Sequence, residues 1–292
     1  MVDTIEVKLS YSGGFADKQQ IDFYDVGQAL IGFQRSLALT THLILNGEII
    51  TQAPSLKGAH IFALPPEKGS WEFKATIVAA AAAIYALGTA PRDTPIGHLI
   101  WSAYDYAISE ALGVHVDYDE TLGQQYEKMR KRESAIEPVP QSKLDALVEK
   151  CEGAIEIMHR PIVRSNTADG ARISSRFGGR QHHCRQVLNE ETFEYIHVTR
   201  RSDTTSEYVG RVSSYNINTF KGRVFVAAEN RPVPFELAAS ARDPRSINCI
   251  TESLMANAQA RHQARGDIRC TAFRNDSKSG RLKSLLIVEV SK

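Results

Sequence analysis

Six signatures of common catalytic and cofactor-binding sites are missing from this chain of 292 residues. Neither glycine loop, GxxxxGKS/T or GxGxxG, occurs, and there is no HExxH, GxSxG or CxxC sequence and no EF-hand calcium loop. These absences remove the strongest reasons to propose a nucleotide-dependent enzyme, a metalloprotease or a serine hydrolase. The sequence therefore predicts no cofactor and favours a protein that is not an enzyme.

Cysteine is scarce and widely spaced. Cys151, Cys184, Cys249 and Cys270 lie 33, 65 and 21 residues apart. This spacing matches neither a disulfide framework nor a zinc ribbon. We expect reduced thiols and a cytoplasmic protein. The N-terminus agrees, because Asp3 and Glu6 stand where a secretory signal would carry basic residues.

Long apolar runs are also few. The longest uncharged stretch, residues 75–90, is shorter than the roughly 20 residues that a bilayer span needs. A second apolar stretch, residues 96–112, is interrupted by His98, Asp105 and Glu110. We expect an Ala-rich helical hairpin buried in an N-terminal domain. The alternative is a membrane-acting effector whose two helices insert after a trigger, and a membrane role is the less favoured of the two.

Net charge is close to zero for the whole chain but not for its parts. Residues 1–159 contain 13 Lys and Arg against 21 Asp and Glu, a net charge of −8. Residues 160–292 contain 22 Lys and Arg against 13 Asp and Glu, a net charge of +9. Such a division is typical either of a polyanion partner for the basic part or of attraction between the two parts, within one chain or between subunits.

Residue patterns in the acidic part indicate both strands and helices. Residues 4–11 alternate between apolar and polar, which predicts a half-buried strand. Residues 21–45 repeat apolar side chains at helical spacing, and Asn46-Gly47 suits a left-handed helix end. Two more strands are expected at residues 59–64 and 70–76. A helix from about residue 142 to 158 is expected to follow the proline-containing segment 134–142.

The basic part begins differently. Residues 164–185 are rich in Gly, Ser and Arg, which predicts an exposed, mobile loop. After it the pattern predicts short strands around one helix at about residues 244–263. The expected strands are residues 192–198, 207–215, 221–228, 233–237, 267–273 and 282–290.

These patterns predict an α+β fold. A mixed α/β N-terminal domain with buried Ala-rich helices would precede a small, mainly antiparallel, barrel-like domain with one helix. The expected division is an acidic domain at 1–135, a linker helix and loop at 136–190, and a basic β-rich domain at 191–292.

Two local clusters have chemical potential, but each has a simpler interpretation. The adjacent His182-His183-Cys184 cannot converge on one zinc ion without distortion of the chain. The group Asp117, Asp119 and Glu120 fits the acidic first turn of a helix. No metal site and no catalytic residue is therefore predicted, although a metal-dependent nuclease or hydrolase built from scattered acids stays an alternative.

Arginine gives the most specific indication of function, because its guanidinium group binds phosphate through two hydrogen bonds and stacks on bases. Aromatic residues between the arginines could supply stacking platforms, as in small barrels that bind single strands. The competing interpretation is that the aromatics form the core and the arginines pair with acid. The predicted binding residues are Arg172, Arg176, Arg180, Arg185, Arg211, Arg223, Arg269, Arg274, Arg281 and Lys283.

Four segments resemble an uncharacterised bacterial family of hypothetical proteins. They are residues 27–36 (GQALIGFQRS), 69–73 (GSWEF), 210–216 (GRVSSYN) and 280–284 (GRLKS). The resemblance covers most of the chain and transfers no activity. It implies a bacterial cytoplasmic protein, with phage defence as a possible context.

The function expected from all of this is non-catalytic binding or assembly. The basic C-terminal half would engage an anionic partner, either DNA or RNA or the acidic face of another subunit in a homo-oligomer.

Overall fold

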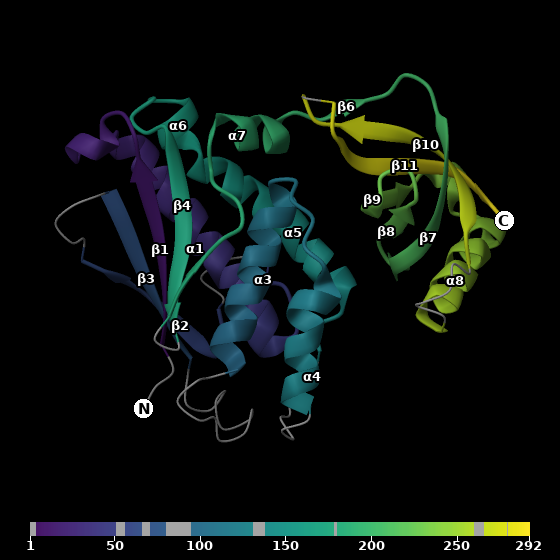
Figure 1. Cartoon of the computed structure of the whole chain (residues 1–292), viewed down its shortest axis with the longest axis horizontal. Coiled ribbons are helices and arrows are strands. Elements are labelled where there is room, and N and C mark those ends of the chain that lie inside the picture. Colours follow the sequence, from purple (N-terminus) through teal and green to yellow (C-terminus); the bar gives the residue numbers. More distant parts are fainter. Residues whose placement is uncertain are drawn as a thin grey trace. The chain divides into compact units, whose positions relative to one another are not determined.

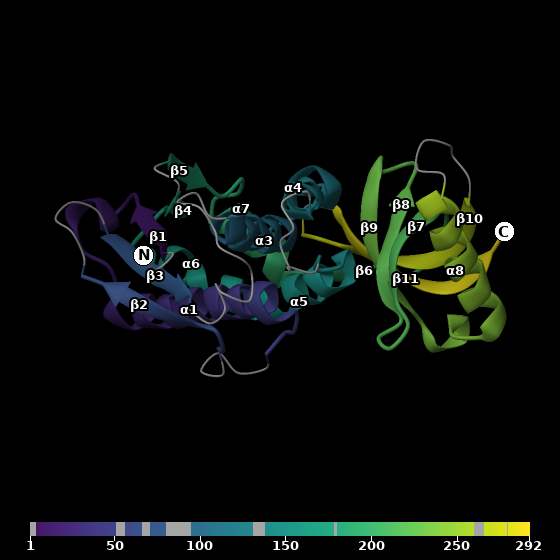
Figure 2. The same cartoon turned by 90° about the horizontal axis from the view of Figure 1, so that it is seen from below.

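The structure is a computed structural model, shown in Figures 1 and 2. It describes residues 4–50, 56–65, 71–79, 95–130, 138–177, 180–259, 266–278 and 280–292. The chain divides into two compact units, Met1–Ile196 and His197–Lys292, and each contains helices and strands. The predicted α+β class is confirmed.

A five-stranded antiparallel sheet organises the first unit. Its order is β2-β3-β1-β4-β5, so β1 (Thr4–Ser12) lies at the centre between β3 (Trp71–Ala79) and β4 (Gly170–Phe177). The edges are β2 (Ala59–Leu64) and β5 (Arg180–His183). Alternate residues of β1 are buried, as the sequence pattern predicts for a strand with one face in the core.

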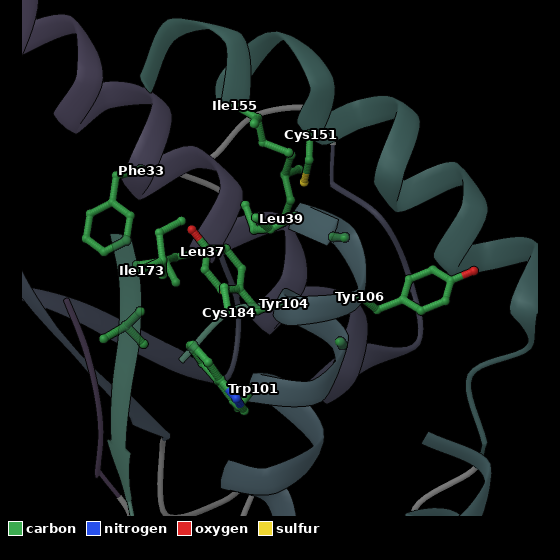
Figure 3. Packing of buried hydrophobic residues seen from close by; sticks show 14 of the residues in the cluster. Phe33, Leu37, Leu39, Trp101, Tyr104, Tyr106, Cys151, Ile155, Ile173 and Cys184 are labelled. Atoms are coloured by element: carbon green, nitrogen blue, oxygen red, sulfur yellow. The ribbon is translucent and has the colours of Figure 1, made fainter. Parts of the chain in front are cut away.

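Helices pack on the inner face of this sheet. The long ones are α1 (Phe23–Asn46), α3 (Pro95–Ala111) and α5 (Gln141–Met158). Figure 3 shows their side chains meeting β4: Phe33 and Leu37 from α1 approach Ile173, and Tyr104 of α3 lies beside them. The shorter elements are the 3-10 turn Ala16–Lys18, the π-helical turn Asp119–Gly123, α4 (Gln124–Arg130), α6 (Arg160–Val163) and α7 (Glu190–His197).

The ends of α1 follow local chemistry. The Asp22 carboxylate accepts a hydrogen bond from the backbone N–H of Asp25 at 2.9 Å, which caps the first turn. At the other end Gly47 has a φ of 69°, and its N–H donates to the carbonyl of Leu43 at 2.8 Å. The left-handed end that the Asn46-Gly47 pair predicts is confirmed.

Two predictions about the last part of the first unit are wrong. Residues 170–177 and 180–183 are strands rather than a mobile loop, because Ala171 and Ile173 are buried while β4 pairs with the central strand β1. Residues 190–197 form α7 rather than a strand. Asn189 and Thr192 exchange backbone-to-side-chain hydrogen bonds of 2.8 Å at its start, a local cap that outweighs the strand-like alternation.

Only part of the predicted Ala-rich hairpin lies within the described residues. Residues 75–79 belong to β3 and are strand, which contradicts the helix expected there. Residues 80–94 lie outside the described residues. Most of residues 96–112 form α3, whose side chains line the core. Within the described ranges, no helix is both long enough and apolar enough to cross a bilayer.

The second unit is a closed barrel of five strands with one described α-helix. The meander β7 (Ser206–Asn216), β8 (Lys221–Val226) and β9 (Arg231–Leu237) comes first. Helix α8 (Pro244–Gln259) follows, and then the hairpin β10 (Ile268–Asp276) and β11 (Leu282–Ser291). A short strand, β6 (Arg200–Arg201), pairs with the end of β10.

The pairing pattern closes the barrel in a specific order. β11 runs parallel to β9, and β10 pairs with both β11 and β7, so the circuit is β7-β8-β9-β11-β10 and back to β7. With the helix between the third and fourth strands, this is the strand order of the OB-fold, a five-stranded Greek-key barrel.

The boundaries differ from those expected. The predicted linker 136–190 belongs to the first unit, because α5, β4 and β5 complete its core and sheet. The second unit begins at His197, a few residues after the expected residue 191.

Candidate nucleic-acid interface

Three of the predicted arginines lie on the sheet of the first unit. Arg172 and Arg176 are exposed on β4, opposite Ser10 and Glu6 of β1, and Arg180 is exposed at the start of β5. Acidic side chains share this outer face, and Lys8 forms a 2.8 Å ion pair with Glu72 across β1 and β3. A shallow cleft of about 220 Å³ there is lined by both signs of charge. The face is therefore mixed rather than basic.

Arg185 follows β5 and is tied to Asp105 of α3. Its backbone N–H donates to the Asp105 carboxylate at 2.9 Å, and its Nε lies 3.5 Å from the second carboxylate oxygen. Because half of the Arg185 side chain stays exposed, the pair is only partly shielded from solvent. This arginine positions the loop after β5, and part of its charge is balanced by Asp105.

On the barrel, one arginine is combined with an aromatic ring on the outer face. Arg211 of β7 and Phe225 of β8 are cross-strand partners, and the guanidinium carbon lies 5.3 Å from the ring centroid. Their inward neighbours, Val212 and Val224, are buried in the barrel core, so the alternation of each strand directs Arg211 and Phe225 outward. Asp267 lies 3.6 Å from Arg211.

The loop between β7 and β8 presents a second such pair, which the set chosen from sequence did not include. Arg242 lies over the ring of Phe220, 4.7 Å from its centroid. Its Nε donates to the carbonyl of Leu237 at 2.9 Å, which holds the side chain across the loop. Nothing in the local sequence predicts a contact across these 22 residues, since it depends on the closed barrel.

Arg223 lies on the same β8 strand but is 2% exposed. Its cross-strand neighbours are Ser214 and Pro234. Arg269, in contrast, is exposed on β10, where its neighbours are Val209 and Ser291. Of these two predicted binding residues, Arg223 on β8 is therefore buried and Arg269 on β10 is exposed.

The last three predicted residues lie in or beside the loop between β10 and β11. Arg274 forms a tight ion pair with Asp276 at 2.7 Å, and this hydrogen bond is the main cause that raises the pKa of the guanidinium. The Lys283 ammonium donates to Thr199 at 2.8 Å. Lys278, near the start of the loop, and Arg281, at its end, are both exposed. Arg274 therefore stabilises the hairpin, Lys283 connects β11 to the segment before β6, and the loop itself presents Lys278 and Arg281.

Two family models match this chain. Residues 7–197 match the model of a domain of unknown function, DUF7946. The chain belongs to the DUF7946 family. Residues 204–291 match a second model, a family of unknown function, DUF7947. No curated protein and no solved structure matches the chain. The predicted membership of an uncharacterised family is confirmed, and it transfers no activity.

The two family matches follow the physical division of the chain. The DUF7946 match ends at residue 197, beside the boundary after Ile196, and the DUF7947 match covers the barrel. The strands and helices that each match covers pack as a compact unit with its own core.

In the DUF7946 unit, Cys184 and Asp117 belong to the two clusters with chemical potential, and each has a structural role. Cys184 is buried, and burial followed by the charge of Asp105 raises its pKa well above the usual value, which disfavours the thiolate. The carboxylate of Asp117 accepts the backbone N–H of Glu120 at 3.0 Å as a helix cap, while the side chain of Asp119 is outside the description. Among the described residues, no group of three or more His, Cys, Asp or Glu could hold a metal ion.

Proposed function

We propose that the barrel, His197–Lys292, binds single-stranded nucleic acid without cleaving it. The observation that carries the proposal is the strand circuit β7-β8-β9-β11-β10 with the helix α8 between its third and fourth strands. Barrels with this order bind oligonucleotides and oligosaccharides on the face of the second and third strands and on two loops, between strands one and two and between strands four and five. Here those positions are β8, β9 and the loops 217–220 and 277–281.

The chemistry at these positions suits a single strand. Phe225 is an aromatic ring on the outer face with Arg211 over it, and base stacking on such a ring tolerates any sequence; Phe220, under Arg242, also packs against the barrel core and supports the first loop. Lys278 and Arg281 in the second loop add positive charge for phosphates. This combination favours an oligonucleotide over a neutral oligosaccharide. The excess of basic residues in 160–292 supports the same choice.

The proposal narrows the set of binding residues. Arg211, Arg281 and Lys283 lie on or beside the proposed face and its loops, whereas Arg269 lies on β10. The buried Arg223 and the mixed-charge sheet of the first unit are left out. A bacterial cytoplasmic setting with a role in phage defence, which the sequence resemblance implies, stays a prediction.

The test is fluorescence anisotropy of a labelled single-stranded DNA, the same RNA and a duplex, with the full chain at several salt concentrations. Arg211→Ala is expected to weaken binding and to reduce the salt slope by about 0.7, the value for one phosphate contact on a single strand. Phe225→Leu is expected to weaken binding by about tenfold with the slope unchanged, because stacking carries no counterion. Arg269→Ala is the matched control and is expected to bind as the parent does.

Three results would contradict the proposal. Binding that is undetectable for all three nucleic acids at low salt would exclude it. Equal losses in Arg211→Ala and Arg269→Ala would show a diffuse charge effect instead of this face. Salt-sensitive self-association without nucleic acid would favour the other expected partner, the acidic face of another subunit.

A further inference from the structure

A cleft of about 330 Å³ in the first unit is independent of the barrel and of the function proposed for it. It lies between α3, the turn that leads into α4, and the chain at and after β5. Its lining residues are His98, Trp101, Ser102, Asp105, Glu120, Thr121, Gln124, Gln125, His182 and Arg185. The volume is within the range of small-molecule sites.

One wall is held in place by hydrogen bonds. The Asp105 carboxylate accepts the backbone N–H of Arg185 at 2.9 Å and the hydroxyl of Ser109 at 3.2 Å. Burial is the main cause that raises the pKa of this carboxyl, against the lowering effect of Arg185. A bound positive charge would offset that cost of burial. Trp101, one turn before Asp105, packs near Tyr104 in the core (Figure 3) and also lines the cleft.

The opposite wall offers a hydrogen-bond acceptor that the fold does not use. The Gln125 side-chain nitrogen donates to the Ser102 hydroxyl at 2.7 Å. Its oxygen is buried and has no partner among the described residues. A buried acceptor without a hydrogen bond destabilises the folded protein. Because the oxygen is covered in this conformation, an N–H group of a ligand in the cleft would satisfy it after a rotation of the Gln125 amide toward the cleft.

The remaining groups also favour a donor. The His98 and His182 rings meet edge to face with centroids 6.1 Å apart. Burial lowers the pKa of His182, with further lowering by His98, Arg180 and His183, so its ring is neutral near pH 7 and adds no positive charge to the cleft. The two carboxylates, Asp105 and Glu120, outnumber the single guanidinium of Arg185.

We propose that this cleft binds a small organic cation, a guanidinium or amine compound, with its N–H groups directed at Gln125, Glu120 and Asp105 and its chain against Trp101. A bare metal ion fits less well, because the described residues do not include three metal ligands in suitable positions. An anion would meet two carboxylates.

Trp101 makes the site observable. The chain has two tryptophans, so Trp71→Phe leaves Trp101 as the only one. In this full-length variant, titration with agmatine and with putrescine is expected to give a saturable change in fluorescence. Adenosine monophosphate, Mg²⁺ and Zn²⁺ are the comparison ligands and are expected to give none.

Surface variants then locate the site without a risk to folding. Glu120 and Glu127 are both exposed acids of adjoining helical turns, and only Glu120 lines the cleft. Glu120→Gln is expected to weaken agmatine binding about tenfold, the loss of one charged contact. Glu127→Gln is expected to leave it unchanged. Gln124→Glu adds a carboxylate at the exposed rim and is expected to tighten binding.

The proposal is overturned by no saturable change with either amine up to about 10 mM, a limit that corresponds to very weak binding. It is equally overturned by the same affinity in Glu120→Gln and Glu127→Gln, by weaker binding in Gln124→Glu, or by preferred binding of the monophosphate or a metal ion. None of these readouts involves the barrel, so the outcome is separate from that of nucleic-acid binding.

Discussion

Buried polar side chains in the first unit show how single residues respond to their surroundings. His159 follows α5 and is fully buried, with one ring nitrogen 2.9 Å from the Ile155 carbonyl and the other 3.0 Å from the Thr192 hydroxyl. Burial lowers its pKa from 6.5 to about 4, against the smaller raising effects of Ile155 and Glu156. The ring is therefore neutral in the folded protein at any pH above that value.

This histidine predicts a loss of stability in mild acid. Below pH 6.5 the unfolded chain binds a proton at His159 that the folded protein accepts only near pH 4, so the free energy of unfolding falls as pH falls through this window. The expected contribution is about 3 kcal/mol at its full extent. Urea unfolding of the parent and of His159→Gln at pH 7 and pH 5 measures the part lost over this range, about 2 kcal/mol. The variant should be less stable at pH 7 but lose less on acidification, and parallel losses would contradict the assignment.

The four cysteines give a second prediction for single residues. All are buried free thiols, and burial raises the pKa of Cys151 and of Cys270 to about 12. Because the thiolate is the reactive form, we expect alkylation by iodoacetamide at pH 8 to be slow in the folded protein and complete in denaturant. Mass spectrometry of both samples checks this. Rapid labelling of Cys151 under native conditions would show that its part of the core opens readily.

At the scale of elements, the approach of α1 to α5 depends on a glycine. A Cβ atom at Gly32 would collide with the carbonyl oxygen of Ala154, which is backbone and cannot turn aside. Gly153, one residue earlier on α5, has open space where its Cβ would lie. The two positions thus differ in what surrounds them, although both are helical glycines.

Matched alanine substitutions test this packing. Gly32→Ala is expected to lower the free energy of unfolding by about 1–3 kcal/mol, because the helices must move apart. Gly153→Ala is expected to raise it by about 0.5–1 kcal/mol through better helix propensity. Chemical denaturation of both variants against the parent is the measurement. Equal and small effects would mean that α1 and α5 shift without cost.

Several elements were predictable from local sequence alone. The alternation at residues 4–11 predicts β1, and helical spacing with the Asn46-Gly47 pair predicts α1 and its end. Local composition misled at residues 170–183, where pairing with β1 orders an Arg- and Ser-rich segment that has little apolar surface of its own. Alternation at residues 192–198 predicts a strand, but the reciprocal cap of Asn189 and Thr192 begins the short helix α7 there.

At the scale of the whole molecule, the basic part of the chain includes the barrel but begins within the first unit. The barrel begins at His197, and the basic residues counted from residue 160 onward extend across it. The sequence alone shows this excess of arginine, but most of the predicted binding residues rest on residue type and not on position in the fold. The structure shows that Arg274, Arg185 and Arg211 already lie beside carboxylates, and it brings Arg242 onto Phe220.

This charge predicts how the full chain behaves in solution. At about 50 mM salt we expect size exclusion with light scattering to show nucleic acid eluting with the protein, and at about 500 mM salt we expect it to dissociate, because counterion release weakens binding steeply. The absorbance ratio of the peak gives the nucleic-acid content. A large species free of nucleic acid that dissociates at high salt would instead favour assembly through the oppositely charged parts.

The sequence by itself determined the α+β class, the central strand, the long first helix and the position of the basic residues, because these depend on short-range periodicity and on composition. The barrel-like second domain was also predicted, but only the tertiary structure decided which strands pair to close it, with β9 parallel to β11, and that α3, α4 and β5 enclose a cleft. Both features bring together residues far apart in the chain. Local sequence patterns do not predict such pairings, because segments far apart in the chain pair only when the core forms and excludes water from both.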